Sequence, residues 1–166
     1  MKILKIILTI LAIASSAASA ADNHKGIPGP NGGKLLKTEP LHAEFFVRPD
    51  KKVNITFYDE AMKPIAPAEQ AVRVIAEAPS GKTTLDFTKT DMALVSTTPL
   101  PAGEGYRIVV QVKQTPDAKP KNFRIDYRVQ TCGECQMPEY ACICEGHSGS
   151  GHGVTRTRAC PIALGN

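Results

Sequence analysis

Between residues 34 and 129, short runs of residues alternate between apolar and polar. In the run 53–58, for example, Val53, Ile55 and Phe57 alternate with polar or aromatic neighbours. A period of two directs one face of a strand to a core and the other face to water. Segments rich in proline and glycine, such as 99–105 and 116–120, separate these runs and are typical of turns. The pattern therefore predicts a series of short strands.

Seven such strands are expected, and no window shows a convincing helical period. Many short strands joined by turns are typical of an antiparallel sandwich of immunoglobulin-like type. The chain has no tryptophan, and this region has no cysteine for an inter-sheet disulfide, so its core must rest on Val, Ile, Leu and a few Phe. We predict an all-β domain over residues 34–130, with strands at 42–47, 53–58, 72–78, 84–87, 94–96, 106–112 and 123–129.

The first twenty residues have the pattern of a secretory signal peptide. Lys2 and Lys5 precede an apolar run over 6–13, and Ala18-Ser19-Ala20 is an A-x-A cleavage site. This predicts a secreted or periplasmic protein, without a membrane span after signal removal because no other apolar segment is long enough. Residues 21–33, rich in Gly, Pro and Asn, are expected to form a flexible N-terminal segment.

Charge and motifs exclude several classes of function. Loss of Lys2 and Lys5 with the signal lowers the formal net charge from +4 to +2, and the remaining basic residues are spread along the chain. Nucleic-acid binders usually carry a basic stripe with aromatic platforms, so no nucleic-acid partner is expected. The sequence has no GxSxG, P-loop, dinucleotide fingerprint or HExxH motif, and we predict that the protein is not an enzyme.

Residues 131–166 form a tail rich in Cys, His and Gly that contains all five cysteines. Four of them, in a CxxC and a CxC, fall within thirteen residues: Cys132, Cys135, Cys142 and Cys144. So short a segment has almost nothing with which to build a packed core, and it needs a metal or disulfides for order. Four thiolates suit Zn(II) or Cu(I), with His147 as a possible substitute for one sulfur.

Disulfides are the alternative, and a secretion signal favours them because oxidising compartments promote such bridges. Cys132 or Cys135 would then pair with Cys142 or Cys144, since a ring within CxC is strained. A redox role is a third interpretation, although no helical pattern follows the CxxC. Cys160 is left over in either scheme, as a free thiol or an intermolecular partner.

Three histidines outside this set are further candidates. After signal cleavage His24 would stand close to the new N-terminal amine, and the two could supply nitrogen ligands for a square-planar Cu(II) or Ni(II) ion. The alternative is that His24 is an idle residue in a tail. His152 is a further candidate near the cysteines. His42 shares a strand face with Glu44 and Phe46, so the His/Glu pair could bind a metal or simply line an edge.

The segments 30–36, 42–47, 53–57 and 63–67 resemble small secreted bacterial domains that open with Pro-His-Gly-Gly and are similar to segments near heavy-metal efflux adaptors. Asn31 stands where those domains have histidine. The resemblance covers roughly residues 28–130, and it implies a small β-sandwich linked to metal handling, with a metal-efflux or envelope protein as a possible partner. The sequence thus predicts a soft-metal carrier or sensor; the alternative is a structural or interaction protein held by disulfides.

Overall fold

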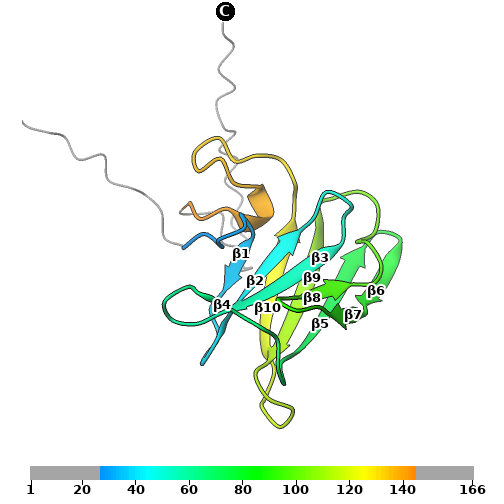
Figure 1. Ribbon diagram of the computed structural model, residues 1–166. Helices are drawn as coiled ribbons and strands as arrows, with labels where there is room; N and C mark the ends of the chain where they lie inside the picture. Colours follow the sequence, from blue (N-terminus) through cyan, green and yellow to red (C-terminus); the bar gives the residue numbers. More distant parts are fainter. Residues whose placement is uncertain (1–26, 145–166) are drawn as a thin grey trace, which may run out of the picture.

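The computed structural model describes residues 27–144, which form two antiparallel β-sheets in a sandwich-like arrangement (Figure 1). The first sheet has six strands in the order β1-β2-β3-β8-β7, and β4 also pairs with β3. Its strands are β1 (Lys34–Leu36), β2 (His42–Val47), β3 (Val53–Tyr58), β4 (Pro64–Ile65), β7 (Phe87–Lys89) and β8 (Leu94–Ser96).

The second sheet has four strands in the order β10-β9-β5-β6. They are β5 (Ala71–Ala78), β6 (Gly81–Leu85), β9 (Tyr106–Lys113) and β10 (Lys121–Tyr127). Every pairing is antiparallel, and β9 lies at the centre, in register with β5 and β10 along almost its whole length. The all-β antiparallel fold expected from the alternation is therefore confirmed.

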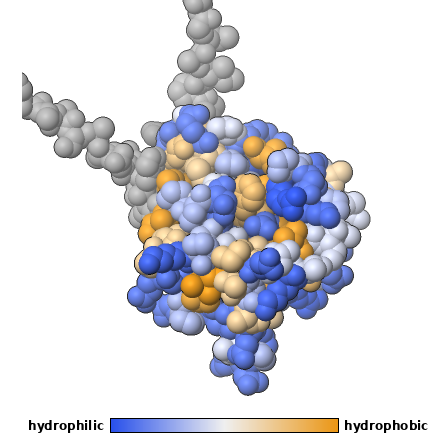
Figure 2. Space-filling model, viewed as in Figure 1, coloured by the Kyte–Doolittle hydropathy of each residue, from blue (hydrophilic) through white to orange (hydrophobic). Residues whose placement is uncertain are grey.

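The core follows the period-two pattern. Ile55 and Phe57 from one sheet, and Val74, Ile108 and Val110 from the other, are fully buried. On β9 the intervening Arg107 is exposed, as alternation requires for a sheet with one face in water. On the face shown in Figure 2, clusters of apolar residues are small and interspersed among polar residues. Among residues 27–144 no helix has the length and apolar character needed to cross a membrane.

Three details of the expected strand list were wrong. The single strand expected at 84–87 is the end of β6 and the start of β7, which belong to different sheets and are separated at Asp86. β1 was missed because Lys34–Leu36 is too short to show alternation. β4 was missed because Pro64 was interpreted as a breaker; it pairs with β3 over only two residues, a placement that proline tolerates at a sheet edge.

The segment before β1 was expected to be flexible, but residues 28–33 form a hydrogen-bonded turn. Pro28 bridges to Lys34, and Gly29 N donates to Gly33 O over 3.1 Å. At Gly33 no larger residue fits, since a Cβ there would lie 2.5 Å from the backbone oxygen of Phe45. Residues 28–33 therefore form a turn joined to the sheet, and residues 21–26 of the expected flexible segment lie outside the described residues.

Glu44 on β2 holds this turn in place. Its side chain is completely buried, and each carboxyl oxygen accepts two hydrogen bonds. Oε1 accepts from the backbone N–H groups of Asn31 and Gly33, at 2.9 and 2.8 Å. Oε2 accepts from the side-chain amide of Asn31 and from the Tyr58 hydroxyl, both at 2.8 Å. A buried polar group is tolerated when it is satisfied in this way, so Glu44 joins the turn to the sheet.

The segment after β10 also contributes to the core, contrary to the expectation that it is only an appendage. A 3₁₀ turn, η1 (Glu139–Ala141), buries Tyr140 and Ala141 in the same apolar cluster as the two sheets. The Tyr140 ring lies 6.0 Å from the rings of both Phe45 and Tyr127, and its hydroxyl accepts a hydrogen bond from Val47 N. One apolar residue in an irregular segment has no periodicity, so the alternation could not reveal it.

Candidate metal centre

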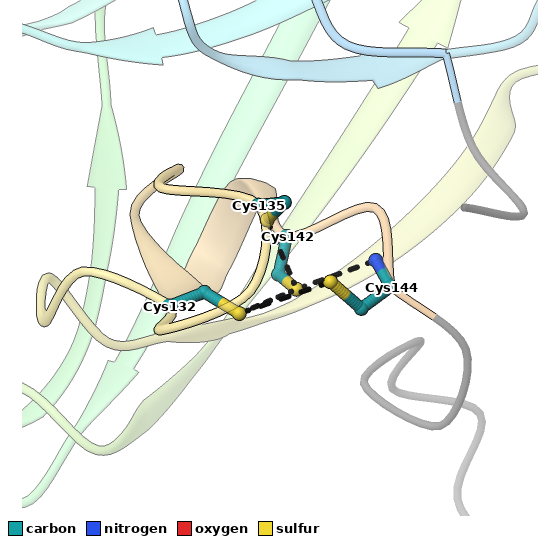
Figure 3. A group of neighbouring side chains, drawn as sticks. All are labelled: Cys132, Cys135, Cys142 and Cys144. Atoms are coloured by element: carbon teal, nitrogen blue, oxygen red, sulfur yellow. Dashed lines mark hydrogen bonds between the residues drawn. The ribbon is translucent and has the colours of Figure 1, made fainter. Parts of the chain in front are cut away.

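The CxxC lies in a tight loop that follows β10. Thr131 and Pro138 form an isolated antiparallel bridge, and Cys132 N donates to Met137 O over 2.8 Å. Gln136 N donates in turn to Cys132 O, and Gln136 adopts a left-handed φ of 59° to close the loop. The loop therefore reverses the chain so that Cys132 and Cys135 lie on its inner side (Figure 3).

The CxC is positioned by η1 and by β10. Tyr140 N donates to Arg128 O over 3.0 Å, and Cys142 N donates to Glu139 O over 3.1 Å. Cys142 then has backbone angles in the polyproline II region, φ −56° and ψ 137°. The two cysteines, with one residue between them, direct both sulfurs to the same group.

The four sulfurs converge, although they come from two separate pairs (Figure 3). Sγ–Sγ distances are 3.5 Å for Cys132–Cys142, 3.6 Å for Cys135–Cys142 and 3.8 Å for Cys132–Cys144, and all four sulfurs lie within 4.8 Å of one another. A tetrahedral zinc with Zn–S bonds of about 2.3 Å requires sulfurs about 3.8 Å apart. The arrangement therefore has nearly the dimensions of a four-thiolate metal site, and these cysteines could hold a metal ion.

The same distances argue against disulfides among the described cysteines. A disulfide needs sulfurs about 2.05 Å apart, and the shortest distance here is 3.5 Å. Cys132, Cys142 and Cys144 are buried, with 5%, 5% and 1% of their surface exposed, whereas Cys135 is partly exposed. The four form a small cluster of their own beside the main core.

Backbone amides lower the pKa of the two CxxC thiols. Hydrogen bonds from the backbone of Cys135 and Glu134 lower the pKa of Cys132. For Cys135, burial raises the pKa, but backbone hydrogen bonds from Ile143 and Met137 prevail and lower it to about 7. Amides directed at a sulfur favour its anionic form, which is the form that binds metal.

The pKa values of the two CxC thiols, those of Cys142 and Cys144, are raised instead. Burial raises the pKa of Cys142 to about 11, and it raises the pKa of Cys144 further. The backbone N–H of Cys144 donates to the Cys142 sulfur at 3.4 Å, which opposes the effect of burial only in part. These two thiols are therefore protonated near neutral pH unless a cation at the centre replaces their protons.

Lys34 supplies a positive charge near the cysteines. Burial lowers the pKa of its ammonium group, while electrostatic interactions with Cys142 and Asp126 oppose that fall. Four thiolates around a divalent ion carry a net charge of −2, which is costly to bury without a partner. A lysine on β1 beside the centre would offset part of the charge of such a metal site, and no spacing in the sequence indicated its position.

The other candidate ligands are placed as follows. Glu44 is occupied by Asn31, Gly33 and Tyr58, and His42 Nδ1 lies 2.8 Å from Thr38 O, so the two do not form a metal pair. Within residues 27–144 the four cysteines are the group with metal-binding geometry. Four further candidates lie outside the described residues: His24, His147, His152 and Cys160.

The fold and the site define an antiparallel, sandwich-like β protein with a four-cysteine group that could hold a metal ion. Comparisons of the chain with protein families, with curated proteins and with solved structures find no match.

Proposed function

We propose that this protein binds one soft metal ion through Cys132, Cys135, Cys142 and Cys144. The single observation that carries the proposal is the approach of all four sulfurs to within 4.8 Å of one another. Tetrahedral four-sulfur sites are typical of zinc or iron, and thiolates also select Cu(I). Zinc is our first expectation because the sulfur separations of 3.5–3.8 Å fit its bond length, and Cu(I) is the second.

The protein acts as a carrier or sensor and not as an enzyme. Catalytic zinc sites keep an open position for water or substrate, whereas non-catalytic, structural sites are filled by protein ligands. Four converging thiols, three of them buried, form a closed set. Cys135, the partly exposed cysteine, offers a place where a partner's thiol could take the ion.

Two features of the sequence support a location outside the cytoplasm and a partner. The pattern of residues 1–20 supports export to the periplasm or beyond. The resemblance of the segments from Pro30 to Pro67 to domains near heavy-metal efflux adaptors supports a metal-efflux or envelope protein as the recipient. By this proposal the protein handles metal in the envelope.

The test is metal content and thiol count of the full chain after export and gentle purification. We expect one zinc per chain and four cysteines that react with a thiol reagent only after the metal is chelated. A chain with two disulfides and no affinity for zinc or Cu(I) after reduction would overturn the proposal, in favour of a disulfide-held interaction protein. Visible absorption distinguishes iron from zinc.

Serine variants identify the ligands. Each of the four substitutions at the centre should weaken zinc binding by about 100-fold or more, since loss of even an outer-shell partner typically costs 10–100-fold. Cys160→Ser is the matched control and should leave the affinity unchanged. If His147→Ala costs more than Cys144→Ser, the ligand set is three cysteines and one histidine, and the assignment of Cys144 is wrong.

A further inference from the structure

The four cysteines at the centre differ in their exposure to water. Cys135 is partly exposed, whereas Cys132, Cys142 and Cys144 are each at most 5% exposed. Of these four residues, Cys135 is therefore the one that a small water-borne oxidant reaches most readily. Susceptibility of a cysteine to oxidation follows its exposure together with its thiolate character, and exposure alone singles out this one.

The sulfurs also lie close enough to be joined in two pairs. Cys135 Sγ lies 3.6 Å from Cys142 Sγ, and Cys132 Sγ lies 3.8 Å from Cys144 Sγ. Cys132 Sγ is as near to Cys142 Sγ, at 3.5 Å, so the first pair is decided by which cysteine is oxidised first. Each pair would need to approach by roughly 1.5–1.8 Å to reach a bond of about 2.05 Å. The inner pair lies within the sequence span of the outer pair, so the two bridges can form in the same chain.

We propose that Cys135 is an oxidation site through which a peroxide releases the metal. This inference rests on the proposed function, because it concerns regulation of the same centre. The Cys135 thiolate attacks one oxygen of hydrogen peroxide, the O–O bond breaks, and sulfenic acid and hydroxide form. The Cys142 thiolate then attacks the Cys135 sulfur, an S–S bond forms, and the sulfenic oxygen leaves as hydroxide. The two hydroxides take up two protons, so two thiolates lose two electrons and peroxide becomes two waters.

Metal release follows from the loss of ligands. A disulfide sulfur has no anionic charge to donate, so the Cys135–Cys142 bridge reduces the set from four thiolates to two. Metal ligation by cysteine requires the deprotonated thiolate. Cys132 and Cys144 alone cannot fill a tetrahedral site, and once the ion leaves they can be oxidised to the second bridge. A dithiol reductant reverses both steps and restores the site.

The experiment uses the full chain loaded with zinc, with Cys160→Ser as a parallel sample to remove the fifth thiol. Hydrogen peroxide is added in steps while a chromogenic chelator measures free zinc and a thiol reagent counts cysteines. We expect one zinc to appear for the first two thiols lost, a Cys135–Cys142 bridge in peptide mass mapping, and full reloading after dithiothreitol. Zinc that stays bound while two thiols disappear, or a first bridge between other cysteines, would overturn the inference.

A matched pair of variants tests the order of events without depending on bound metal. Cys142→Ser and Cys144→Ser each remove one thiol from the centre, but only the first removes the partner of Cys135. After peroxide treatment of the reduced, metal-free variants, dimedone should label Cys135 in Cys142→Ser and much less in Cys144→Ser. Equal labelling would refute Cys142 as the resolving thiol. A reduced chain that never binds zinc but shows this labelling contradicts the proposed function and leaves the thiol chemistry intact.

Discussion

Replacing Tyr140 by alanine tests whether the cysteine loop is part of the sandwich core. Tyr140 is 4% exposed, lies between the two cysteine pairs, and contacts Phe45 and Tyr127 with its ring. Removing a large buried aromatic side chain typically costs ~3–5 kcal/mol. A domain of this size has a total stability of ~5–15 kcal/mol. Tyr140→Ala should therefore remove a large fraction of the stability of the whole sandwich.

Tyr140→Phe separates the ring from the hydroxyl. This variant keeps both ring contacts and loses only the hydrogen bond from Val47 N, which is 3.1 Å long. The net contribution of such a bond is ~1 kcal/mol. At roughly 4 °C per kcal/mol for a domain of about this length, the melting temperature should fall by ~4 °C for Tyr140→Phe and by ~12–20 °C for Tyr140→Ala.

The assay is thermal unfolding of the β signal in far-ultraviolet circular dichroism, with zinc and with excess chelator. Met92→Ala is the control, because Met92 is 47% exposed and its loss should change stability by no more than ~0.5 kcal/mol. Zinc at a thousand times its dissociation constant adds ~4 kcal/mol, so chelation should lower the melting temperature of the β signal itself. If Tyr140→Ala melts within ~3 °C of the unaltered protein, the loop is not part of the core and the reasoning fails.

Three other outcomes are expected. Glu44→Ala should lower the free energy of unfolding by ~3 kcal/mol or more, because it leaves several buried donors unsatisfied. Glu44→Gln, which keeps the side-chain volume, should lower it less, and equal melting temperatures for these two variants would contradict this. Gly33→Ala should lower stability by ~1–3 kcal/mol, since its Cβ would lie 2.5 Å from a backbone oxygen of β2; chemical denaturation measures the loss, and an unchanged midpoint would contradict the clash. Zinc affinity should fall by ~100-fold for each unit by which the pH is lowered near neutrality. The reason is that Cys142 and Cys144, with their raised pKa values, each release a proton when they bind the ion. Competition titrations at pH 6, 7 and 8 measure the slope, and a flat profile would exclude thiolate ligands.

The strands and the cysteine set could be predicted from the sequence because both are repeated signals. Alternation located β2, β3, β5, β9 and β10 to within a few residues. On β5, β9 and β10 buried residues do alternate with more exposed ones, whereas β2 and β3 each bury a run of consecutive residues. The passage of the chain from one sheet to the other at Asp86 was not predictable in this way, because the strand-like sequence continues through this residue without interruption.

Single contacts between distant segments escaped the sequence pattern. Tyr140 is one aromatic residue in an irregular loop, and only its contacts with β2 and β10 show that it completes the core. Glu44 was grouped with His42 on a strand face, but whether it binds an ion or a backbone turn depends on what packs against it. The cysteine spacing identified the four candidate ligands, but it could not indicate which sulfur reaches solvent.

The tyrosines make the protein its own optical probe. The chain has no tryptophan and four tyrosines, all of them at most 5% exposed. Tyr106, Tyr127 and Tyr140 form a chain of ring contacts, 5.1 and 6.0 Å between centroids, that runs from β9 to the loop carrying the cysteines. Near-ultraviolet circular dichroism and intrinsic fluorescence therefore arise from phenol rings fixed between the sheets and that loop. A displacement of the loop would be visible in these spectra without any attached dye.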